Sequence, residues 1–342
     1  MTGIRWFVCL ILLALSHSAY TVSPEINIQQ RQFEFERENW NKVRLPKGLA
    51  SVPRKSHDLR HSGYSGVSMY AQNMLLNYTG GIEFDIASLS ALLEPTQAGR
   101  PVELNDIRTF SIDIVSGNLT LPEKTLEFLF NRHVLNYKER SLRNVSIQTD
   151  ADGIYIDAEV RLNKPFPRQW LRAQMAGHVS LDQQQRISID IKQMKMLNMP
   201  LGKPMQMLDL SLDRFVTLDR PGVKLKGRQI KIDLGVLPPP RLNGRLSRAV
   251  STANGINIQF SSPQGIIFDT PPISSNSYMW LQSGDLRLSN MIILNGHLQA
   301  LNVNPHERLK FHLYSAIDQI AGGHVRINAA SDVIAYLPSV IP

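Results

Sequence analysis

The amino-acid sequence predicts an α+β fold in which long antiparallel strands, each apolar on one face, are covered by a few helices. Two observations support this prediction. After residue 104, many segments alternate apolar and polar residues with a period of two, which is typical of strands that bury one face. Few segments carry apolar residues at helical spacing. A sheet that is apolar on one side must be covered by helices or fold around something, so the helices are expected to lie on the apolar face.

The clearest predicted strand spans residues 153–162. Ile154, Ile156, Ala158 and Val160 lie on one face of this strand, and polar or charged side chains alternate with them. The same alternation predicts further strands at 110–114, 186–192, 230–234, 255–260, 286–288 and 298–300.

A helix is predicted at 121–135, directly after the strand at 110–114. Leu126, Leu129, Phe130 and Val134 form an apolar stripe along it. Thr120 is the expected N-cap residue, and the proline at position 122 suits the first turn.

Two more helices are predicted within the β-rich region, again from the spacing of apolar residues. They are 204–216, with Met205, Leu208, Leu212 and Phe215 on one face, and 306–320, with Leu309, Leu313, Ile317 and Ile320. Gly322 and Gly323 are expected to end the second of them.

Residues 1–19 have the features of a cleaved signal peptide. Arg5 precedes an unbroken apolar run at 6–15, and Ser16 and Ser18 follow at the spacing that a signal peptidase reads. The run is short for a transmembrane helix, which needs about 20 apolar residues. We therefore expect export to the periplasm or the extracellular space, with an uncleaved membrane anchor as the alternative.

Residues 20–66 are predicted to form a basic, flexible arm that precedes the main domain at 67–342. Lys and Arg are concentrated at 42–60, where Asp58 is the single acidic residue. Such an arm can make a peripheral contact with anionic lipid headgroups or with another polyanion, or it can be a solvated leader.

Cysteine usage and missing motifs predict a protein that is not an enzyme and that uses no cofactor and no metal site. The single cysteine, Cys9, lies within the signal peptide, so the mature chain has no thiol for a nucleophile, a disulfide or a zinc site. The sequence contains no GxSxG, HExxH, P-loop or GxGxxG pattern. Two carboxylates, or a His–carboxylate pair, converging in one pocket would instead favour an enzyme.

The net charge of +8 favours anionic partners without selecting nucleic acid. Lys and Arg are spread along the polar faces of the predicted strands, and aromatic residues make up only 7% of the chain. A nucleic-acid surface instead combines clustered basic residues with stacking aromatics or a groove-reading helix. We therefore expect no nucleic-acid partner.

The methionines are concentrated in one stretch. Met194, Met196, Met199, Met205 and Met207 fall close together, and three interpretations fit them. They can fill a core, they can form a pliable lining for flexible acyl chains, or their thioethers can bind a soft metal such as Cu(I).

Between residues 104 and 260, the predicted elements follow a particular order. The order is carried by Ser111-Ile112-Asp113-Ile114, 121–135, 145–162, Leu197-Asn198-Met199-Pro200 with 205–216, 222–234 with Leu237-Pro238-Pro239-Pro240, and 244–260. It resembles the bacterial phospholipid-binding branch of the tubular lipid-binding (TULIP, BPI-like) superfamily. The resemblance implies a long curved antiparallel β-sheet wrapped around one or two helices, enclosing an apolar tube for acyl chains. Residues 274–342 lie outside it and are expected to form a β-rich C-terminal extension, as added strands or as a separate lobe.

These observations predict an exported binding protein that carries or senses a lipid or another long apolar ligand in an apolar groove, without catalysis. Affinity would come from burial, at about 0.8 kcal/mol per CH₂ removed from water. The expected lining consists of Ile154, Ile156, Val160, Ile187, Ile189, Ile191, Met196, Met205, Leu208, Leu212, Ile230 and Ile232. The alternative is a structural or adhesive cell-envelope protein with a dry β-sandwich core, which binds a protein or a polysaccharide through its basic arm.

Overall fold

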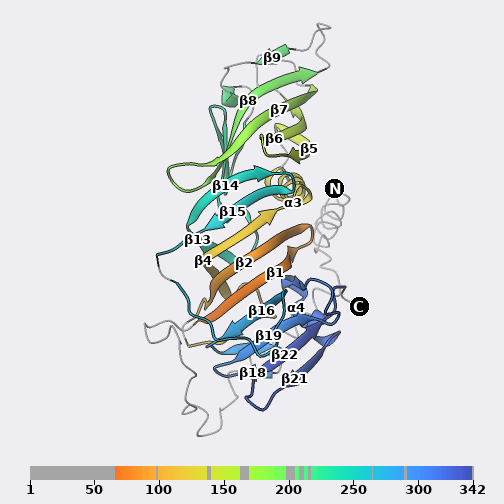
Figure 1. Cartoon of the computed structure of the whole chain (residues 1–342). Coiled ribbons are helices and arrows are strands. Elements are labelled where there is room, and N and C mark those ends of the chain that lie inside the picture. Colours follow the sequence, from red (N-terminus) through yellow and green to blue (C-terminus); the bar gives the residue numbers. More distant parts are fainter. Residues whose placement is uncertain are drawn as a thin grey trace, which may run out of the picture. The chain divides into compact units, whose positions relative to one another are not determined.

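The computed structural model describes residues 66–97, 99–136, 140–161, 169–197, 205–207, 212–214, 217–263, 265–288 and 291–340. All of them belong to one compact unit, Arg54–Pro342, which is mainly β-sheet (Figure 1). The predicted signal peptide (1–19) and residues 20–65 of the predicted basic arm lie outside the described residues.

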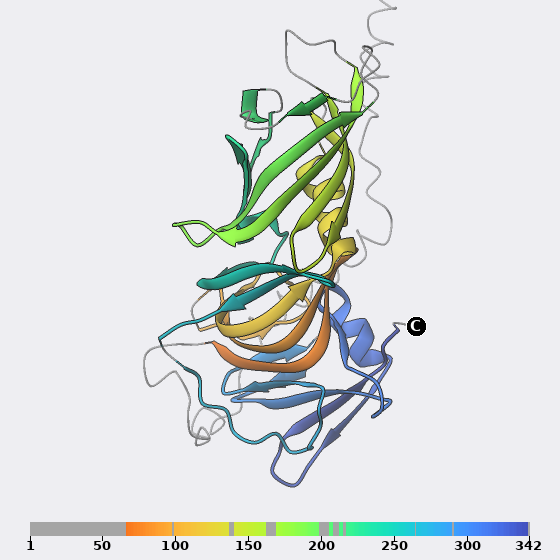
Figure 2. The same ribbon diagram turned by 45° about the horizontal axis from the view of Figure 1, so that its top comes forward.

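The first sheet runs in the order β14-β15-β4-β2-β1-β16-β19-β22-β21, with β13 beside β4 and β20 beside β1. Its strands are β1 (Val67–Thr79), β2 (Ile82–Pro95), β4 (Phe110–Leu121), β13 (Arg241–Gly244), β14 (Leu246–Thr252), β15 (Gly255–Phe260), β16 (Tyr278–Gln282), β19 (His297–Asn302), β20 (Lys310–His312), β21 (His324–Ile327) and β22 (Val333–Leu337). Figure 2 shows how strongly β1, β2 and β4 bend. The pairs β13–β4, β20–β1 and β22–β19 are parallel and the other pairs of this sheet are antiparallel.

The second sheet is antiparallel and runs in the order β10-β11-β12-β8-β7-β6-β5, with β9 beside β8. Its strands are β5 (Leu142–Thr149), β6 (Ile154–Arg161), β7 (Trp170–Leu181), β8 (Ile187–Leu197), β9 (Met205–Met207), β10 (Asp219–Arg220), β11 (Val223–Lys226) and β12 (Gln229–Ile232). A small third sheet joins β3 (Val102–Glu103), β17 (Leu286–Leu288) and β18 (Met291–Ile293).

The period-two pattern is confirmed where the sequence is most regular. In β6 the alternate residues Ile154, Ile156, Ala158 and Val160 are buried, and the residues between them are exposed or half-buried. This follows from strand geometry, because successive side chains point to opposite faces of the sheet. The other predicted strands correspond to β4, β8, β12, β15, β17 and β19.

The C-terminal residues add strands to the first sheet. β16 pairs with β1, from Ser68 opposite Gln282 to Gln72 opposite Tyr278, and β19, β22 and β21 follow outward from β16. Most of the predicted extension at 274–342 is thus continuous with the sheet formed by β1, β2 and β4.

The helix predicted at 121–135 is present as α3 (Glu123–Phe128), which continues as a π-helix, η3 (Leu129–Val134). The expected cap is wrong: Thr120 lies in β4, opposite Asp85, and Pro122 is the N-cap without a side-chain hydrogen bond. The strand is longer than its alternation suggested, and its pairing with β2 and β15 occupies the residues up to Leu121.

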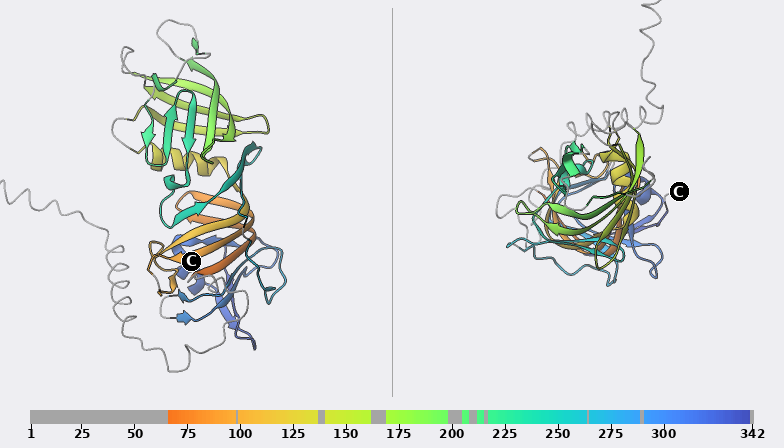
Figure 3. Two further views of the ribbon diagram at one scale, coloured as in Figure 1. Left: turned by 90° about the vertical axis from the view of Figure 1, so that its left-hand side faces the viewer. Right: turned by 90° about the horizontal axis from the view of Figure 1, so that it is seen from above.

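Helix α3 and η3 connect the two sheets, as the yellow segment in Figure 3 shows. On one side, the Thr125 hydroxyl donates to the Glu83 carbonyl of β2 at 2.8 Å and accepts from the Glu83 N–H at 3.0 Å. On the other side, Glu123, Glu127 and Asn131 bond to the backbone of the edge strand β5. Their spacing of four residues places them on one helix face. This face accepts hydrogen bonds from the backbone of the edge strand β5, as a neighbouring strand would.

The helix predicted at 204–216 is wrong where the structure describes it. Met205–Met207 is strand β9, with Met205 opposite Met196 on β8, and Leu212–Arg214 is a short 3-10 turn, η4. Leu208 and Phe215 lie outside the described residues. An extended segment here can form hydrogen bonds with the backbone edge of β8. This pairing favours a strand over the helix that the spacing of apolar residues suggests.

The helix predicted at 306–320 is correct only in its second half. Lys310–His312 forms β20, followed by a 3-10 turn, η6 (Leu313–Ser315), and helix α4 (Ala316–Ala321), which ends at Gly322. The Leu309 carbonyl accepts the Leu75 N–H of β1 at 2.9 Å, so pairing with β1 holds the first half extended.

Candidate ligand-binding site

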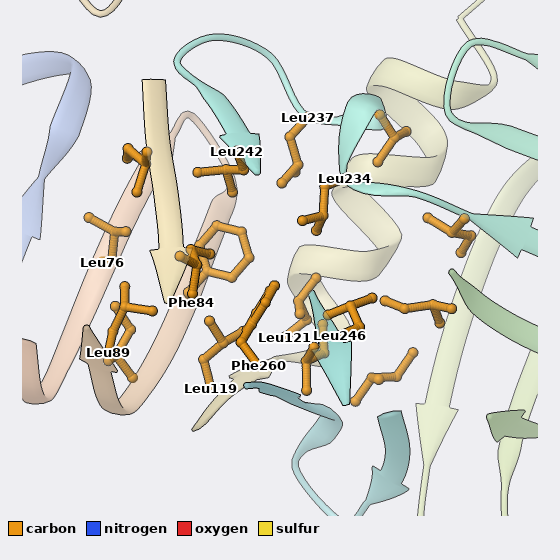
Figure 4. A pocket seen from close by; sticks show the side chains of 18 of the residues that line it. Leu76, Phe84, Leu89, Leu119, Leu121, Leu234, Leu237, Leu242, Leu246 and Phe260 are labelled. Atoms are coloured by element: carbon orange, nitrogen blue, oxygen red, sulfur yellow. The ribbon is translucent and has the colours of Figure 1, made fainter. Parts of the chain in front are cut away.

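An apolar pocket lies where the first sheet meets the second, close to helix α3 (Figure 4). It is lined by β1, β2, β4, β13, β14 and β15 of the first sheet, by β8 and β12 of the second, and by α3 and η3. Its volume is about 60 Å³. The side chains labelled in Figure 4 are Leu76, Phe84, Leu89, Leu119, Leu121, Leu234, Leu237, Leu242, Leu246 and Phe260.

The lining is apolar with one exception. Every residue is Leu, Ile, Val, Met or Phe apart from Asp233, which is exposed. Such a surface has no fixed partner for a charged or hydrogen-bonding group, and burying one there without a partner would cost several kcal/mol. The pocket can therefore accept a hydrocarbon group and disfavours a polar one.

The pairing of β4 with β2 on one side and with β15 on the other places many of the lining residues next to one another. Ile86 lies opposite Leu119 in the β2–β4 pair, and Leu119 lies opposite Ile258 in the β4–β15 pair. All three residues are buried and line the pocket.

Gly244 provides the space for one wall of the pocket. A Cβ atom built at this position would lie 2.8 Å from a ring carbon of Phe260 and 3.1 Å from the Cβ of Ile114. Both neighbours line the pocket, so the absence of a side chain at residue 244 allows β13 to lie against β4 and leaves room for the Phe260 ring.

One wall of the pocket is a chain segment rather than a strand. We name residues 233–240 the proline strap: it includes the 3-10 turn η5 (Leu234–Val236) and ends with Pro238, Pro239 and Pro240 before β13. Leu234, Val236 and Leu237 are half-buried and line the pocket.

Two tyrosine hydroxyls hold the proline strap. Tyr78 of β1 shares its hydroxyl proton between the carbonyls of Pro238, at 3.0 Å, and Pro240. Tyr314 of η6 donates to the Pro239 carbonyl at 2.5 Å. Proline has no N–H, so its carbonyl is the only backbone group through which these residues can be hydrogen-bonded.

The two tyrosines differ in their surroundings. Tyr78 is 0% exposed and packs edge-on against Phe84, with ring centroids 5.7 Å apart, whereas Tyr314 is 42% exposed. Burial, with the nearby Tyr314 as a smaller cause, raises the pKa of Tyr78 well above that of a free tyrosine. Tyr78 is therefore a neutral donor across the physiological pH range.

The predicted lining overlaps the pocket at two residues, Ile187 and Ile232. Seven others are buried within the core of the second sheet and are not part of the pocket lining: Ile154, Ile156, Val160, Ile189, Ile191, Met196 and Ile230. Leu212 is also buried in the core. The backbone of Met205 belongs to β9, but the structure does not describe its side chain, and Leu208 lies outside the described residues.

Sequence reasoning missed the lining that comes from the first sheet. The apolar faces of the strands at 110–114 and 255–260 were recognised, but the alternation does not tell which strands are neighbours. Only the pairing of β15 with β4, and of β4 with β2, shows that their apolar faces form one surface. The strand β2, which supplies Phe84, Ile86 and Leu89, was not predicted as a long alternating strand.

The methionine cluster is part of the pairing at β8. Met194 lies opposite Met207 and Met196 opposite Met205. Met194 and Met196 are both buried in the core, which agrees with the core-filling interpretation for these two side chains. Met199 lies outside the described residues.

One His–carboxylate pair is buried away from the pocket. The Nδ1 atom of His297 lies 3.2 Å from Oδ1 of Asp332, and the His297 and Trp280 rings form a T-shaped pair with centroids 5.3 Å apart. Neither His297 nor Asp332 lines the apolar pocket. Within the described ranges, no three His, Cys, Asp or Glu residues are close enough together to hold a metal ion.

No family model, no curated protein and no solved structure matches this chain. In the part of the chain that the structure describes, no helix has the length and apolar character needed to cross a membrane.

Proposed function

We propose that the protein binds a lipid or another long apolar ligand in the apolar pocket and carries or senses it without catalysing a reaction. The observation that carries this proposal is the apolar pocket lining, to which both sheets and the proline strap contribute. Burying an alkyl chain there would contribute about 0.8 kcal/mol per CH₂.

The volume of the pocket sets a condition on this proposal. An engineered dry cavity of about 150 Å³ binds benzene, whereas this pocket has about 60 Å³. A long acyl chain therefore requires the walls to move apart. The proline strap is the wall best suited to move. Its three prolines are held by two tyrosine hydroxyls, whereas the other walls are largely strands or helix, which backbone hydrogen bonds hold in place.

The curved sheets and the helix between them are compatible with the TULIP-like arrangement that the sequence resembles. We infer that the bent strands β1, β2 and β4 and the second sheet together wrap around α3 and η3, with the apolar pocket as the closed form of an acyl-chain site. The predicted export to the periplasm or the extracellular space, and a peripheral contact of the basic arm with an anionic membrane, belong to the same proposal.

Purified full-length protein tests the proposal directly. Extraction into organic solvent followed by mass spectrometry should recover a bound lipid, and a fluorescent fatty acid or phospholipid should be taken up. The substitution Leu237→Trp fills the pocket from a half-buried position on the strap and should abolish uptake. Leu225→Trp is the matched control, because Leu225 is equally half-buried, on β11, and does not line the pocket.

The small volume favours a second candidate, a structural or adhesive cell-envelope protein with a dry core. In that case the apolar pocket is a packing gap between the two sheets. Absence of any extracted lipid, together with equal and negligible uptake by the natural protein and both tryptophan variants, would favour this candidate over the carrier.

A further inference from the structure

The second sheet carries a polar hollow on the face opposite its buried core. Its volume is about 900 Å³, within the range of ordinary small-molecule sites. The outward-facing side chains form two rows across β5, β6, β7 and β8. The rows are Gln148, Tyr155, Ala176 and Gln193, and Ser146, Asp157, Gln174 and Lys195.

The charges within the polar hollow are largely paired. Arg172 binds Asp157 through two parallel hydrogen bonds, Nε to Oδ1 at 2.9 Å and Nη2 to Oδ2 at 2.7 Å. Gln174 donates to the same carboxylate at 3.4 Å. Lys195 is the one other charged residue of the lining. A polyanion such as a nucleic acid needs several cations for its phosphates, so this hollow is better matched to a ligand without formal charge.

Two glutamines offer polar groups that the protein itself does not use. Gln148 on β5 and Gln193 on β8 are exposed, and neither side chain has a hydrogen-bond partner among the described residues. An amide both donates and accepts, which complements hydroxyl groups that also do both.

An aromatic ring stands between these amides. Tyr155 of β6 is 41% exposed, which is high for a large apolar side chain. Its hydroxyl interacts with Asp150, which is the main cause that raises the pKa of Tyr155. The neighbour in its row is Ala176, whose methyl group leaves space between Tyr155 and Gln193.

We propose that the polar hollow binds a neutral oligosaccharide. Tyr155 stacks on the C–H face of one sugar ring, and Gln148 and Gln193 form hydrogen bonds with hydroxyl groups of the oligosaccharide. A sugar has an apolar C–H face and a rim of groups that both donate and accept. The hollow has one exposed ring with amides on both sides, and its Asp157–Arg172 pair adds a rigid donor and acceptor. The surface is separate from the apolar pocket and does not depend on the lipid-binding proposal.

The test is titration calorimetry of the full-length protein with neutral hexasaccharides of glucose, mannose, galactose and N-acetylglucosamine, and with heparin as a polyanionic comparison. We expect binding of at least one neutral hexasaccharide whose affinity changes little between about 50 mM and about 500 mM salt, because no phosphate or sulfate is neutralised. The variants Tyr155→Ala and Gln148→Ala/Gln193→Ala should each weaken it by about tenfold or more.

The control is Gln229→Ala, which removes the same amide from an exposed position on β12 outside the hollow and should bind like the natural protein. Circular dichroism and urea unfolding of each variant separate loss of the site from loss of the fold. Failure of every neutral hexasaccharide to bind overturns the proposal, as does binding that Tyr155→Ala and the double variant leave unchanged. Salt-sensitive binding of heparin alone, if Tyr155→Ala and the double variant weaken it, would assign the face to polyanions and also overturn it.

Discussion

The hydroxyl of Tyr78 donates a hydrogen bond to the carbonyl of Pro238, which lies 160 residues later in the chain, at 3.0 Å. Tyr78 is at the end of β1, and Pro238 belongs to the proline strap that closes the apolar pocket. This contact links the framework of the first sheet to the wall that a ligand would have to displace. It gives the first prediction.

The substitution Tyr78→Phe should open the proline strap more often. It removes the hydroxyl but keeps the ring, and it leaves the Pro238 and Pro240 carbonyls without this donor, at a cost of about 1–3 kcal/mol. If the closed form of the proline strap loses about 1 kcal/mol of stability, the fraction of molecules with an open strap rises about fivefold. Stopped-flow fluorescence should therefore show faster uptake and release of a fluorescent fatty acid. Tyr314→Phe, at the exposed contact to Pro239, should have a smaller effect, and equal rates for all three proteins would contradict the role of the strap.

The substitution Gly244→Val should fill space at the pocket wall. Its side chain meets Phe260 and Ile114, so we expect destabilisation of about 1–3 kcal/mol from overpacking and weaker uptake of apolar ligand. Urea unfolding measures the first effect and fluorescent-lipid titration the second. Gly265→Val is the control, since a Cβ at residue 265 meets no atom within 4 Å. Unchanged stability of the Gly244 variant would show that β13 is free to shift.

The substitution Asn131→Ala should detach η3 from strand β5. The Asn131 side chain accepts the Val145 N–H at 2.9 Å and donates to the Val145 carbonyl at 2.7 Å. Its removal leaves both backbone groups without this partner, and we expect a loss of about 1–3 kcal/mol in the free energy of unfolding. Hydrogen exchange of the β5 amides should rise at the same time. His133→Ala, at an exposed position on the same helix, should leave exchange at β5 unchanged.

Asp182 should contribute a pH-dependent part of the stability. Burial opposes its ionisation, but hydrogen bonds from the Arg186 side chain and backbone and from Lys231 prevail and lower its pKa to about 2. A carboxyl with a pKa near 3.9 in the unfolded chain then contributes stability that is complete above that value and is lost as the pH falls through about 2.

The matching experiment compares the natural protein with Asp182→Asn. At neutral pH the free energy of unfolding of the variant should be lower by about 1 kcal/mol, because solvent screens part of the ion-pair energy. The difference should shrink as the pH is lowered from about 4 towards about 2. Urea unfolding at several pH values measures it. A difference that stays constant down to the lowest pH would mean that the carboxylate charge is not what stabilises the turn between β7 and β8.

The sequence predicted the strands well where alternation was regular, and it predicted helices poorly outside 121–135. Residues 154–160 alternate without interruption, so their buried face could be predicted directly. At Met205 and at Leu309 the apolar spacing suggested a helix, but a neighbouring strand offered backbone hydrogen bonds that the spacing does not reveal.

The candidate site was less predictable for the same reason. Ile187 and Ile232 were expected to line it and do, but Phe84, Leu119 and Phe260 join them only through strand register. The pattern within one segment shows which face of a strand is buried, but it does not identify the partner strand, which can lie far away in the sequence.

The position of β1 has a consequence for how the chain is made. β1 lies between β2, which follows it directly, and β16, and the Ser277 hydroxyl beside β16 donates to the Asn73 carbonyl 204 residues earlier. During synthesis, the β1–β2 hairpin can form early, but one backbone edge of β1 stays without its partner until residues beyond 277 have emerged. Chains that stop before β16 would keep this edge open, so premature termination should give products that associate edge to edge instead of folding as monomers.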